Sequence, residues 1–297
     1  RLRDKAVVYL SPYEHNAVAR SVHELAKKKG LIVKEIPINS DLEIDLEKMK
    51  YEFVKDRPDA IFCTHVSNVT GYILPVKEIF EESKKYDCIN ILDSAQSLGL
   101  VEIQANLMKI DIMAFAGHKT LYGPLGIGGF INISGIPLDV FISGGTGSDS
   151  LNLEMPDGKE SRYESASCNI VAVAGLNAAL KVIDPVFCMR WEKELSDYLI
   201  DQLSSMKKIK VYLPGNQKQH VGIVSFVVQG FSSEDIGTIL DEDFDIAVRT
   251  GYHCAPFIHK YLRDTGNQGT VRVGLGQFST MNDIDKLIAG LKEIIDE

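Results

Sequence analysis

One lysine of this sequence has a setting suited to covalent chemistry. Lys119 follows the apolar, strand-like run 110–115 and lies in the Gly-rich turn Gly117-His118-Lys119. A lysine at the exit of a packed strand has its amine beside apolar surface, where desolvation lowers its pKa toward the range useful for Schiff-base formation. The alternative is an ordinary loop lysine with its ammonium in water, because buried lysines are uncommon. The His-Lys pair alone favours the alternative, so the interpretation depends on the neighbouring motifs.

Three other residues suit the binding of a charged aromatic ring. Asp93 ends the apolar run 90–93, and its carboxylate can pair with a protonated pyridine nitrogen or cap the following turn. Gln96 reaches the same place and can donate to a phenolate oxygen. His15 follows the first predicted strand and can stack on a ring, although lone histidines are more often structural. With Lys119, these residues would all serve one pyridine cofactor joined to the lysine.

The first two thirds of the chain alternate short apolar runs with helical patterns. Strands are predicted at 5–10, 31–36, 60–64, 89–92, 112–115 and 128–133, and helices at 17–29, 46–55 and 76–86. This alternation predicts a mostly parallel sheet covered by helices on both faces. Ligands bind such sheets at the carboxyl ends of the strands. His15, Asn68, Asp93 and Lys119 follow the first, third, fourth and fifth strands, so we expect them to meet there.

The last third of the chain predicts a smaller domain. A long helical pattern, 169–191, is interrupted at Pro185 and leads out of the large domain. After it we expect helices at 192–206, after 232–235 and from 282, with strands at 222–228, 246–249 and 270–273. Ser232 and Asp235 have the spacing of a helix N-cap. The predicted fold class is α/β, with a large domain at 1–180 and a small α+β domain at 181–297.

Composition restricts the partners and the location. The chain has 297 residues, of which 45% are hydrophobic and 25% charged, as in an ordinary globular protein. Its formal net charge of −9 argues against nucleic-acid binding. Its apolar runs are shorter than the roughly 20 residues that span a bilayer, and its charged start lacks the apolar core of a signal peptide, so we expect no membrane partner and a cytoplasmic location. Five cysteines without C-x-x-C spacing indicate reduced thiols and no metal site.

Ordered motifs connect the chain to a known family. They are Glu14–His15, Ser67–Gly71, Asp93–Gln96, Gly117–Lys119, Tyr122–Pro124, Gly144–Ser148, Arg162–Glu164, Ala247–Pro256 and Thr270–Val273. In these motifs the chain resembles the class V enzymes of aspartate aminotransferase fold (fold type I) that use pyridoxal 5'-phosphate, and within them the cysteine desulfurases and selenocysteine lyases. The resemblance covers nearly the whole chain, and the motifs occur in family order.

The resemblance implies a role for each residue around the cofactor ring. Lys119 would hold pyridoxal phosphate covalently and later move the Cα proton of the substrate. Asp93 would pair with the pyridine nitrogen, Gln96 would contact the phenolic oxygen, and His15 would stack on the ring. Asn68 matches the position that contacts the cofactor or the substrate near that oxygen.

The resemblance also implies how the phosphate is held. His118 matches a residue that helps to hold it, and Ser167 matches a hydroxyl supplied across a dimer interface. Ala116 stands where many relatives have a serine, which removes one hydroxyl able to contact the phosphate. The family's N-terminal Gly/Thr-rich turn, whose amides cradle the phosphate, does not precede Arg1. Either residues of the natural protein are missing from this sequence or it is a natural fragment with an impaired cofactor site, and the intact downstream residues favour the former.

On the substrate side, Arg272 matches the arginine that receives the α-carboxylate, for which a planar guanidinium offers two parallel hydrogen bonds. A surface salt bridge at a strand end is the alternative for this residue. Cys254 matches the nucleophile that takes the sulfur of L-cysteine as a persulfide while alanine is released. We expect His253 and Arg249 to favour the Cys254 thiolate, and we count Arg249 with the substrate-binding residues.

Three functional hypotheses result. The resemblance implies a homodimeric, pyridoxal-phosphate-dependent cysteine desulfurase that passes sulfur from L-cysteine to an acceptor protein. The second hypothesis is a selenocysteine lyase or another class V aminotransferase or lyase, which would differ in its need for Cys254 with cysteine as substrate. The third is a fragment without cofactor that keeps the fold but has no activity. A lysine-bound cofactor distinguishes the first two from the third.

Overall fold

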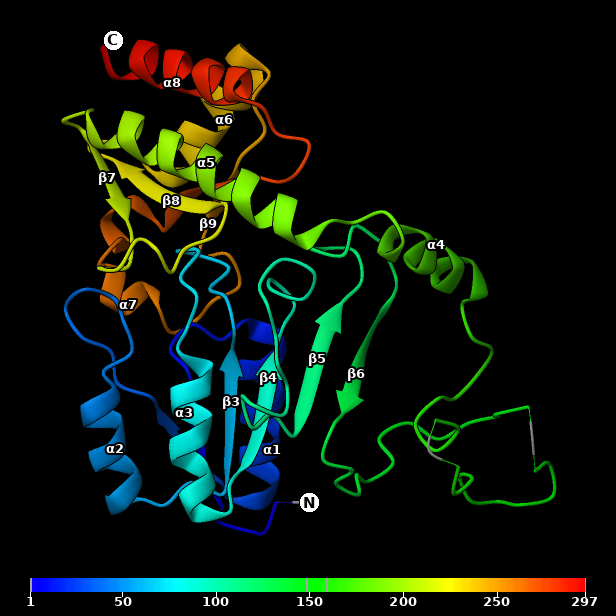
Figure 1. The fold of residues 1–297 in the computed structure, drawn as a ribbon. Helices are drawn as coiled ribbons and strands as arrows, with labels where there is room; N and C mark the ends of the chain where they lie inside the picture. The colour runs from blue at the N-terminus through cyan, green and yellow to red at the C-terminus, as the bar shows by residue number, and fades with distance from the viewer. Residues whose placement is uncertain (1, 148, 159, 297) are drawn as a thin grey trace.

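The computed structural model describes residues 2–147, 149–158 and 160–296, and its first part is a six-stranded sheet (Figure 1). The sheet has the order β2-β1-β3-β4-β5-β6, from β1 (Val7–Leu10), β2 (Ile32–Glu35), β3 (Ala60–Thr64), β4 (Ile89–Asp93), β5 (Ile112–Ala116) and β6 (Gly128–Asn132). The first five strands run parallel, and β6 is antiparallel to β5. The predicted α/β fold with a mostly parallel sheet is therefore confirmed.

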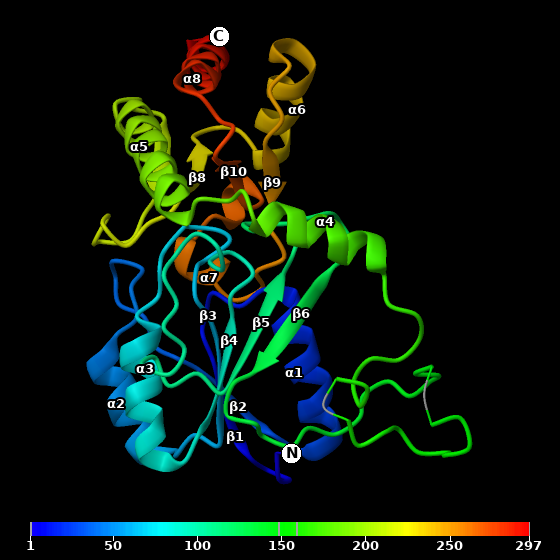
Figure 2. The same ribbon diagram turned by 45° about the vertical axis from the view of Figure 1, so that its right-hand side comes forward.

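Helices cover both faces of this sheet (Figure 2). One face carries α1 (Asn16–Lys29), and the other carries α2 (Leu46–Lys55) and α3 (Val76–Ser83), which the short 3-10 helix η1 (Lys84–Tyr86) follows. The start of α1 is fixed by His15, whose Nδ1 accepts a hydrogen bond from the Ala17 amide, and its end by Gly30 at φ +63°. Since β1 leads directly into this helix start, His15 must lie at the carboxyl end of β1.

The core between the sheet and α2 and α3 is aromatic and aliphatic. Tyr9, Phe53, Ile61, Phe80 and Leu92 are all buried there, and the Tyr9 and Phe53 rings meet edge to face with centroids 4.8 Å apart. Burying side chains of this size contributes roughly 1.5–3 kcal/mol each. This packing holds β1, β3 and β4 in register, and those strands carry polar residues at their exits.

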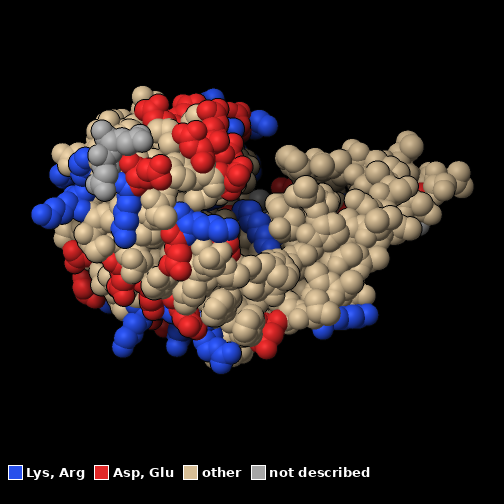
Figure 3. Space-filling view, turned by 90° about the horizontal axis from the view of Figure 1, so that it is seen from above, with Lys and Arg blue, Asp and Glu red and all other residues tan. Residues whose placement is uncertain are grey.

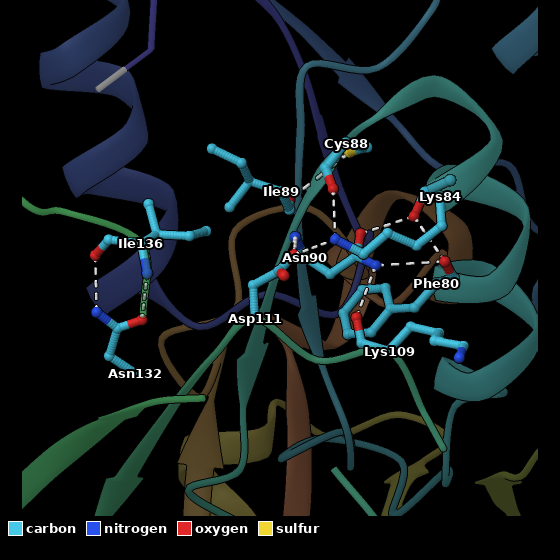
Figure 4. Close-up of polar contacts among 10 residues, drawn as sticks. Phe80, Lys84, Cys88, Ile89, Asn90, Lys109, Asp111, Asn132 and Ile136 are labelled. Atoms are coloured by element: carbon cyan, nitrogen blue, oxygen red, sulfur yellow. Dashed lines mark hydrogen bonds and ion pairs between the residues drawn. The ribbon is translucent and has the colours of Figure 1, made fainter. Parts of the chain in front are cut away.

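A polar network fixes β4 against β5 at the opposite, amino ends (Figure 4). Asp111 Oδ2 accepts from the Asn90 amide at 2.7 Å and pairs with Lys84 Nζ at 2.5 Å. The Asn90 side chain donates to the Lys109 carbonyl at 2.9 Å. Because these groups are largely buried and mutually satisfied, they set the relative height of β4 and β5. The exits of the two strands, toward Asp93 and Lys119, are therefore held at one level.

The second sheet is antiparallel and follows in the chain. It has the order β7-β8-β10-β9, from β7 (Ile209–Tyr212), β8 (Ile223–Val228), β9 (Arg249–Gly251) and β10 (Thr270–Gly274). Its helices are α5 (Pro185–Ser204), α6 (Ser233–Phe244) and α8 (Met281–Asp296), and α7 (His259–Leu262) and the 3-10 helix η2 (Thr265–Asn267) lie in the connection from β9 to β10. The predicted N-cap is confirmed as a capping box between Ser232 and Asp235.

Two predicted element boundaries are wrong, for local reasons. The interruption predicted at Pro185 is itself confirmed: the pattern over 169–191 divides into α4 (Ile170–Leu180) and α5, because Asp184 caps a new helix with Pro185 in its first turn. The predicted helix 192–206 is the remainder of α5. The predicted strand 246–249 lies mostly before β9, because α6 ends only at Phe244 and the chain needs the next residues to turn. The domain division at residues 180 and 181 stays a prediction.

The segment between β6 and α4 extends away from the sheet (Figure 1). Phe141, Leu151 and Leu153 in this segment are almost fully exposed. The predicted motif 144–148 ends at Ser148, which lies outside the described residues. Among the described residues no single helix has the length and apolarity to cross a membrane, although α4 and α5, bent by 77°, meet that criterion together.

Candidate active site

A cavity of about 680 Å³ lies at the carboxyl ends of β1, β3, β4 and β5. These strand ends point toward the second sheet (Figure 1). The predicted site residues that line the cavity are His15, Asn68, Asp93, Gln96, His118, Lys119, Arg249 and Arg272. Arg249 and Arg272 come from β9 and β10, so the two sheets build the site together. Ser167 is exposed and is not among the lining residues, so its role stays a prediction.

The lysine turn is tight and closed by backbone hydrogen bonds. The Gly117 amide donates to the Ile127 carbonyl at 2.9 Å, and the Gly123 amide donates to the Gly117 carbonyl at 2.8 Å. A Cβ at Gly123 would lie 2.8 Å from the backbone carbonyl oxygen of Gly117 and 2.8 Å from the Leu176 side chain of α4, so the tight turn requires glycine. Burial lowers the pKa of Lys119, and the nearby Asp93 opposes this effect. Desolvation thus produces the more nucleophilic amine that the sequence predicts.

Asp93 caps the turn after β4 and also lines the cavity, so its pairing with a pyridine nitrogen stays a prediction. Its Oδ1 accepts from the Ala95 amide at 2.9 Å, which caps the turn after β4, and its side chain also lines the cavity. His15 stands across the cavity as the cap of α1. Because its Nδ1 accepts from Ala17, the proton of the neutral ring is on Nε2, and burial lowers the pKa of His15. A neutral imidazole can stack on a protonated pyridine ring without charge repulsion.

Asn68 connects the cavity wall to β10 and to the turn that follows β9. Its Nδ2 donates to the His253 carbonyl at 2.7 Å, and its own carbonyl accepts from Arg272 Nη1 at 2.8 Å. Its Oδ1 is buried without a hydrogen-bond partner among the described residues. A buried acceptor left open in a cavity wall is a site for a donor on a ligand. Burial lowers the pKa of Arg272 to about 10, which leaves its guanidinium charged at neutral pH.

Cys254 lies in a strained turn beside the cavity. The Ala255 amide donates to the Tyr252 carbonyl at 2.9 Å, and the two residues between them, His253 and Cys254, have φ of +49° and +56°. Two positive φ values are those of a type I′ turn, which glycine and asparagine favour, so each residue here costs about 1–3 kcal/mol. Arg249 Nη2 donates to Cys254 Sγ at 3.5 Å. The turn presents the sulfur to a guanidinium.

The expectation that His253 supplies positive charge to Cys254 is wrong. Burial, reinforced by Arg272, lowers the pKa of His253 to about 3, so its ring is neutral at physiological pH. Its Nε2 lies 2.8 Å from Oγ1 of Thr270, the first residue of β10. Arg249 is therefore the cation that contacts the sulfur.

Glu14 lines the cavity, and the sequence does not reveal its protonation state. It is fully buried, and its Oε1 accepts from Ser11 Oγ at 2.5 Å and from the Thr64 amide at 2.6 Å. Burial raises its pKa to about 8, and the Asp93 charge adds to this effect. Glu14, the chain neighbour of His15, thus keeps its proton at neutral pH. The sequence signal is only its place before His15 in a motif.

A pH dependence of stability follows from Glu14. Its folded pKa of about 8 exceeds the ordinary glutamate pKa of 4.5, so the folded state binds more protons than the unfolded state between these values. The contribution of Glu14 to the free energy of unfolding is therefore fully present below about pH 4.5. It falls as the pH rises toward 8, by up to about 1.4 kcal/mol per pH unit. We expect Glu14→Gln to remove this slope in urea unfolding at pH 5 and pH 8. Glu293→Gln, at an exposed position on α8, is the control, and equal slopes in all three proteins would contradict the assignment.

A second cavity of about 400 Å³ adjoins the first and shares Gln96, Lys119 and Arg272 with it. It is also lined by Glu192 of α5, which accepts from the Gly222 amide at 3.3 Å. Burial raises the pKa of Glu192 to about 7, so this carboxyl exchanges its proton near neutral pH. Sequence reasoning missed Glu192, because it lies within a regular helical pattern that gives no separate signal.

A family model named aminotransferase class V matches residues 1–287. The chain belongs to the aminotransferase class V family. The family depends on pyridoxal 5'-phosphate, which confirms the cofactor and the fold type that the motifs predict. Its members are enzymes, so a binding module without catalysis is no longer the natural interpretation.

Relatives within this class V family carry closely related names. The chain is 32% identical over 302 residues to a "Probable cysteine desulfurase" of Pyrococcus abyssi, covering 98% of this chain and 72% of that protein. It is 29% identical to "Probable cysteine desulfurase 2" of Mycobacterium leprae, over 98% of this chain and 69% of that protein. The solved apo structure of a cysteine desulfurase from Thermococcus onnurineus is similar with a TM-score of 0.88 and 28% identity, over 99% of this chain and 74% of that one.

The residues of this class V site fit the cofactor ring. The cavity offers an amine of lowered pKa at Lys119, a carboxylate at Asp93, a neutral ring at His15 and the open acceptor of Asn68. Their types match an aldehyde, a protonated pyridine nitrogen, a ring face and a hydroxyl. Gln96 and His118 line the same cavity and are available to the ring oxygen and the phosphate. The donor set therefore agrees with pyridoxal phosphate.

Proposed function

We propose that this chain is a pyridoxal-phosphate-dependent cysteine desulfurase, which converts L-cysteine to L-alanine and takes the sulfur on Cys254 as a persulfide. One observation carries the proposal: Cys254 Sγ accepts a hydrogen bond from Arg249 and lies near enough to Lys119 and Arg272 for its charge to raise the pKa of both. The cavity is lined by Arg249 and by His253, the chain neighbour of Cys254, so the thiol lies at the edge of the cavity. The names of the relatives support the same reaction.

The roles follow from the chemistry of each side chain. When bound, pyridoxal phosphate withdraws electrons from the Cα of the amino acid joined to it. Burial lowers the pKa of Lys119, so a larger fraction of its amine is unprotonated and available to take the Cα proton. Asp93 would keep the ring nitrogen protonated, and Arg272 would receive the α-carboxylate. The three side chains line one cavity, so they are available to the same bound substrate.

The sulfur step is assigned to Cys254. Its thiolate forms a bond to the substrate sulfur while the carbon–sulfur bond of the substrate breaks. The electron pair goes to the substrate Cβ, which then takes a proton. Lys119 returns a proton to Cα, so alanine leaves and the persulfide stays on Cys254. Arg249 stabilises negative charge on the attacking sulfur and on the persulfide that results. An acceptor protein would then remove the outer sulfur.

We also propose a homodimer and a cytoplasmic location. Ile170, Val171 and Val182 in and after α4 are more than 70% exposed. This projecting part of the molecule shows few charged side chains (Figure 3), as expected of a surface that a second copy covers. In such a dimer, Ser167 would be available to the partner's phosphate site. The five free cysteines support a reducing compartment.

The test of the function is the release of alanine and sulfide from L-cysteine, with added pyridoxal phosphate and a thiol reductant. We expect equal amounts of the two products. A protein that binds the cofactor and yet releases no alanine would contradict the proposal. Release from selenocysteine alone would instead identify a selenocysteine lyase.

Arg272→Lys tests the carboxylate assignment. A lysine keeps the charge but loses the paired hydrogen bonds, so we expect the KM for L-cysteine to rise about 10- to 100-fold, as for the loss of a charged hydrogen bond. We expect kcat to change less, which steady-state kinetics will resolve. Arg190→Lys, at an exposed position of α5, is the matched control. A KM like that of wild type would place the carboxylate elsewhere.

A further inference from the structure

The turn that carries Cys254 is held at its first residue by two donors. The Tyr252 carbonyl accepts from the Ala255 amide at 2.9 Å and from His259 Nε2 at 3.0 Å. His259 begins α7, directly after the turn. The His259 ring therefore lies against the turn, and its hydrogen bond to the Tyr252 carbonyl adds to the Ala255 hydrogen bond that closes the type I′ turn.

The acceptor on Tyr252 fixes the proton on the His259 ring. A carbonyl oxygen can only accept, so Nε2 must carry a hydrogen. On the other side of the ring, Nδ1 lies 2.5 Å from Asp264 Oδ2, and this distance requires a second proton between the two atoms. The pair therefore holds one shared proton, either as imidazolium and carboxylate or as neutral imidazole and carboxylic acid. In both forms Nε2 stays a donor toward Tyr252.

The surroundings keep this pair in place. Asp264 is fully buried and His259 is 5% exposed. The Tyr252 ring meets the His259 ring edge to face at 5.0 Å, and the His253 ring is tilted at 6.1 Å. Tyr212 of β7 also faces Asp264, whose charge adds to the effect of burial in raising the Tyr212 pKa to about 12. Neither member of the pair lines the two cavities of the site.

We infer that Asp264 and His259 are positioning residues that hold Cys254 beside Arg249 through the Tyr252 carbonyl. Asp264 fixes the proton on the ring, the ring fixes Tyr252, and the turn keeps His253 and Cys254 at positive φ. The inference rests on the proposed role of Cys254 in taking sulfur. Without this donor the turn relaxes, and Cys254 Sγ leaves its 3.5 Å contact with Arg249.

The rate of amide hydrogen exchange in the peptide 251–258 measures the stability of the turn, and it depends neither on activity nor on bound cofactor. In His259→Phe the ring volume remains but the donor is lost, and we expect the Ala255 amide to exchange about tenfold faster, as for one lost hydrogen bond. In His259→Gln the side-chain amide can donate in place of Nε2, so exchange should stay near that of wild type. Thermal unfolding of both variants separates a local effect from global destabilisation.

A second pair of variants covers the case in which the Phe variant does not fold. In Asp264→Asn the side-chain amide donates to Nδ1 and leaves the hydrogen on Nε2, so we expect wild-type exchange. In Asp264→Leu the ring loses its partner, and we expect the faster exchange of His259→Phe. This pair separates the effect of the hydrogen bond from that of charge.

Steady-state kinetics with L-cysteine supply the functional readout. We expect His259→Phe and Asp264→Leu to lower kcat at least tenfold with an unchanged KM, because Arg272 is not affected, and we expect His259→Gln and Asp264→Asn to restore kcat. Equal exchange in wild type and His259→Phe would overturn the inference, as would equal losses of kcat in the Phe and Gln variants. Absence of alanine release by wild type would instead sink the proposed function, and the exchange data would still decide whether the pair holds the turn.

Discussion

Lys119→Ala is expected to abolish alanine formation and to leave pyridoxal phosphate without its covalent attachment. The substitution removes both the amine that holds the aldehyde and the base that takes the Cα proton. Loss of the proton transfer alone costs about 10²- to 10⁴-fold. The variant should lack the near-visible absorbance band of lysine-bound cofactor, and denaturation after borohydride treatment should leave no cofactor on the chain.

Lys77→Ala is the matched control for this variant. Lys77 is exposed on α3, where its Nζ lies 3.9 Å from Glu81 Oε1. It does not line either cavity. It should keep the absorbance band and the rate of wild type. If Lys119→Ala retained a borohydride-stable attachment, another lysine would have to be the anchor, and the interpretation of the Gly117–Lys119 turn would be wrong.

Cys254→Ala is expected to lower the release of alanine and sulfide from L-cysteine by at least about a hundredfold, as the removal of a covalent nucleophile does. The absorbance band of the cofactor should persist, because Cys254 is not among the residues that line the ring cavity. The variant thereby separates cofactor binding from the sulfur-transfer step. The measurement is alanine formation over time at saturating L-cysteine.

Cys168→Ala is its control, since Cys168 is an exposed thiol, whereas Cys63, Cys88 and Cys188 are buried. A rate equal to that of wild type is expected for this control. Unchanged alanine release by Cys254→Ala would refute the persulfide step and would leave a class V enzyme of another reaction type.

Much of the site was predictable because parallel sheets bring strand ends together. His15, Asp93 and Lys119 follow three different strands of one βα pattern, and the sheet order alone places them around one cavity. The glycines of the lysine turn are visible in the sequence, but the reason for Gly123 is seen only in the structure, where a Cβ would lie 2.8 Å from the Gly117 carbonyl oxygen.

Other features depend on burial that no local pattern encodes. Burial keeps Glu14 protonated, although the hydrogen bond from the Thr64 amide, 50 positions away, lowers its pKa in part. His253 is neutral because β10 covers it, which reversed the role expected from its place beside Cys254. The pairing of His259 with Asp264 spans the end of a four-residue helix, a spacing with no recognised motif.

The intact mass of the protein after a brief incubation with L-cysteine, without reductant, tests the central claim most directly. We predict a species heavier by one sulfur atom, removable by reductant, with the added sulfur located on Cys254 by peptide mapping. Cys254→Ala should show no such species. Formation of alanine by wild type without added sulfur on Cys254, or with the sulfur on Cys168, would contradict this account.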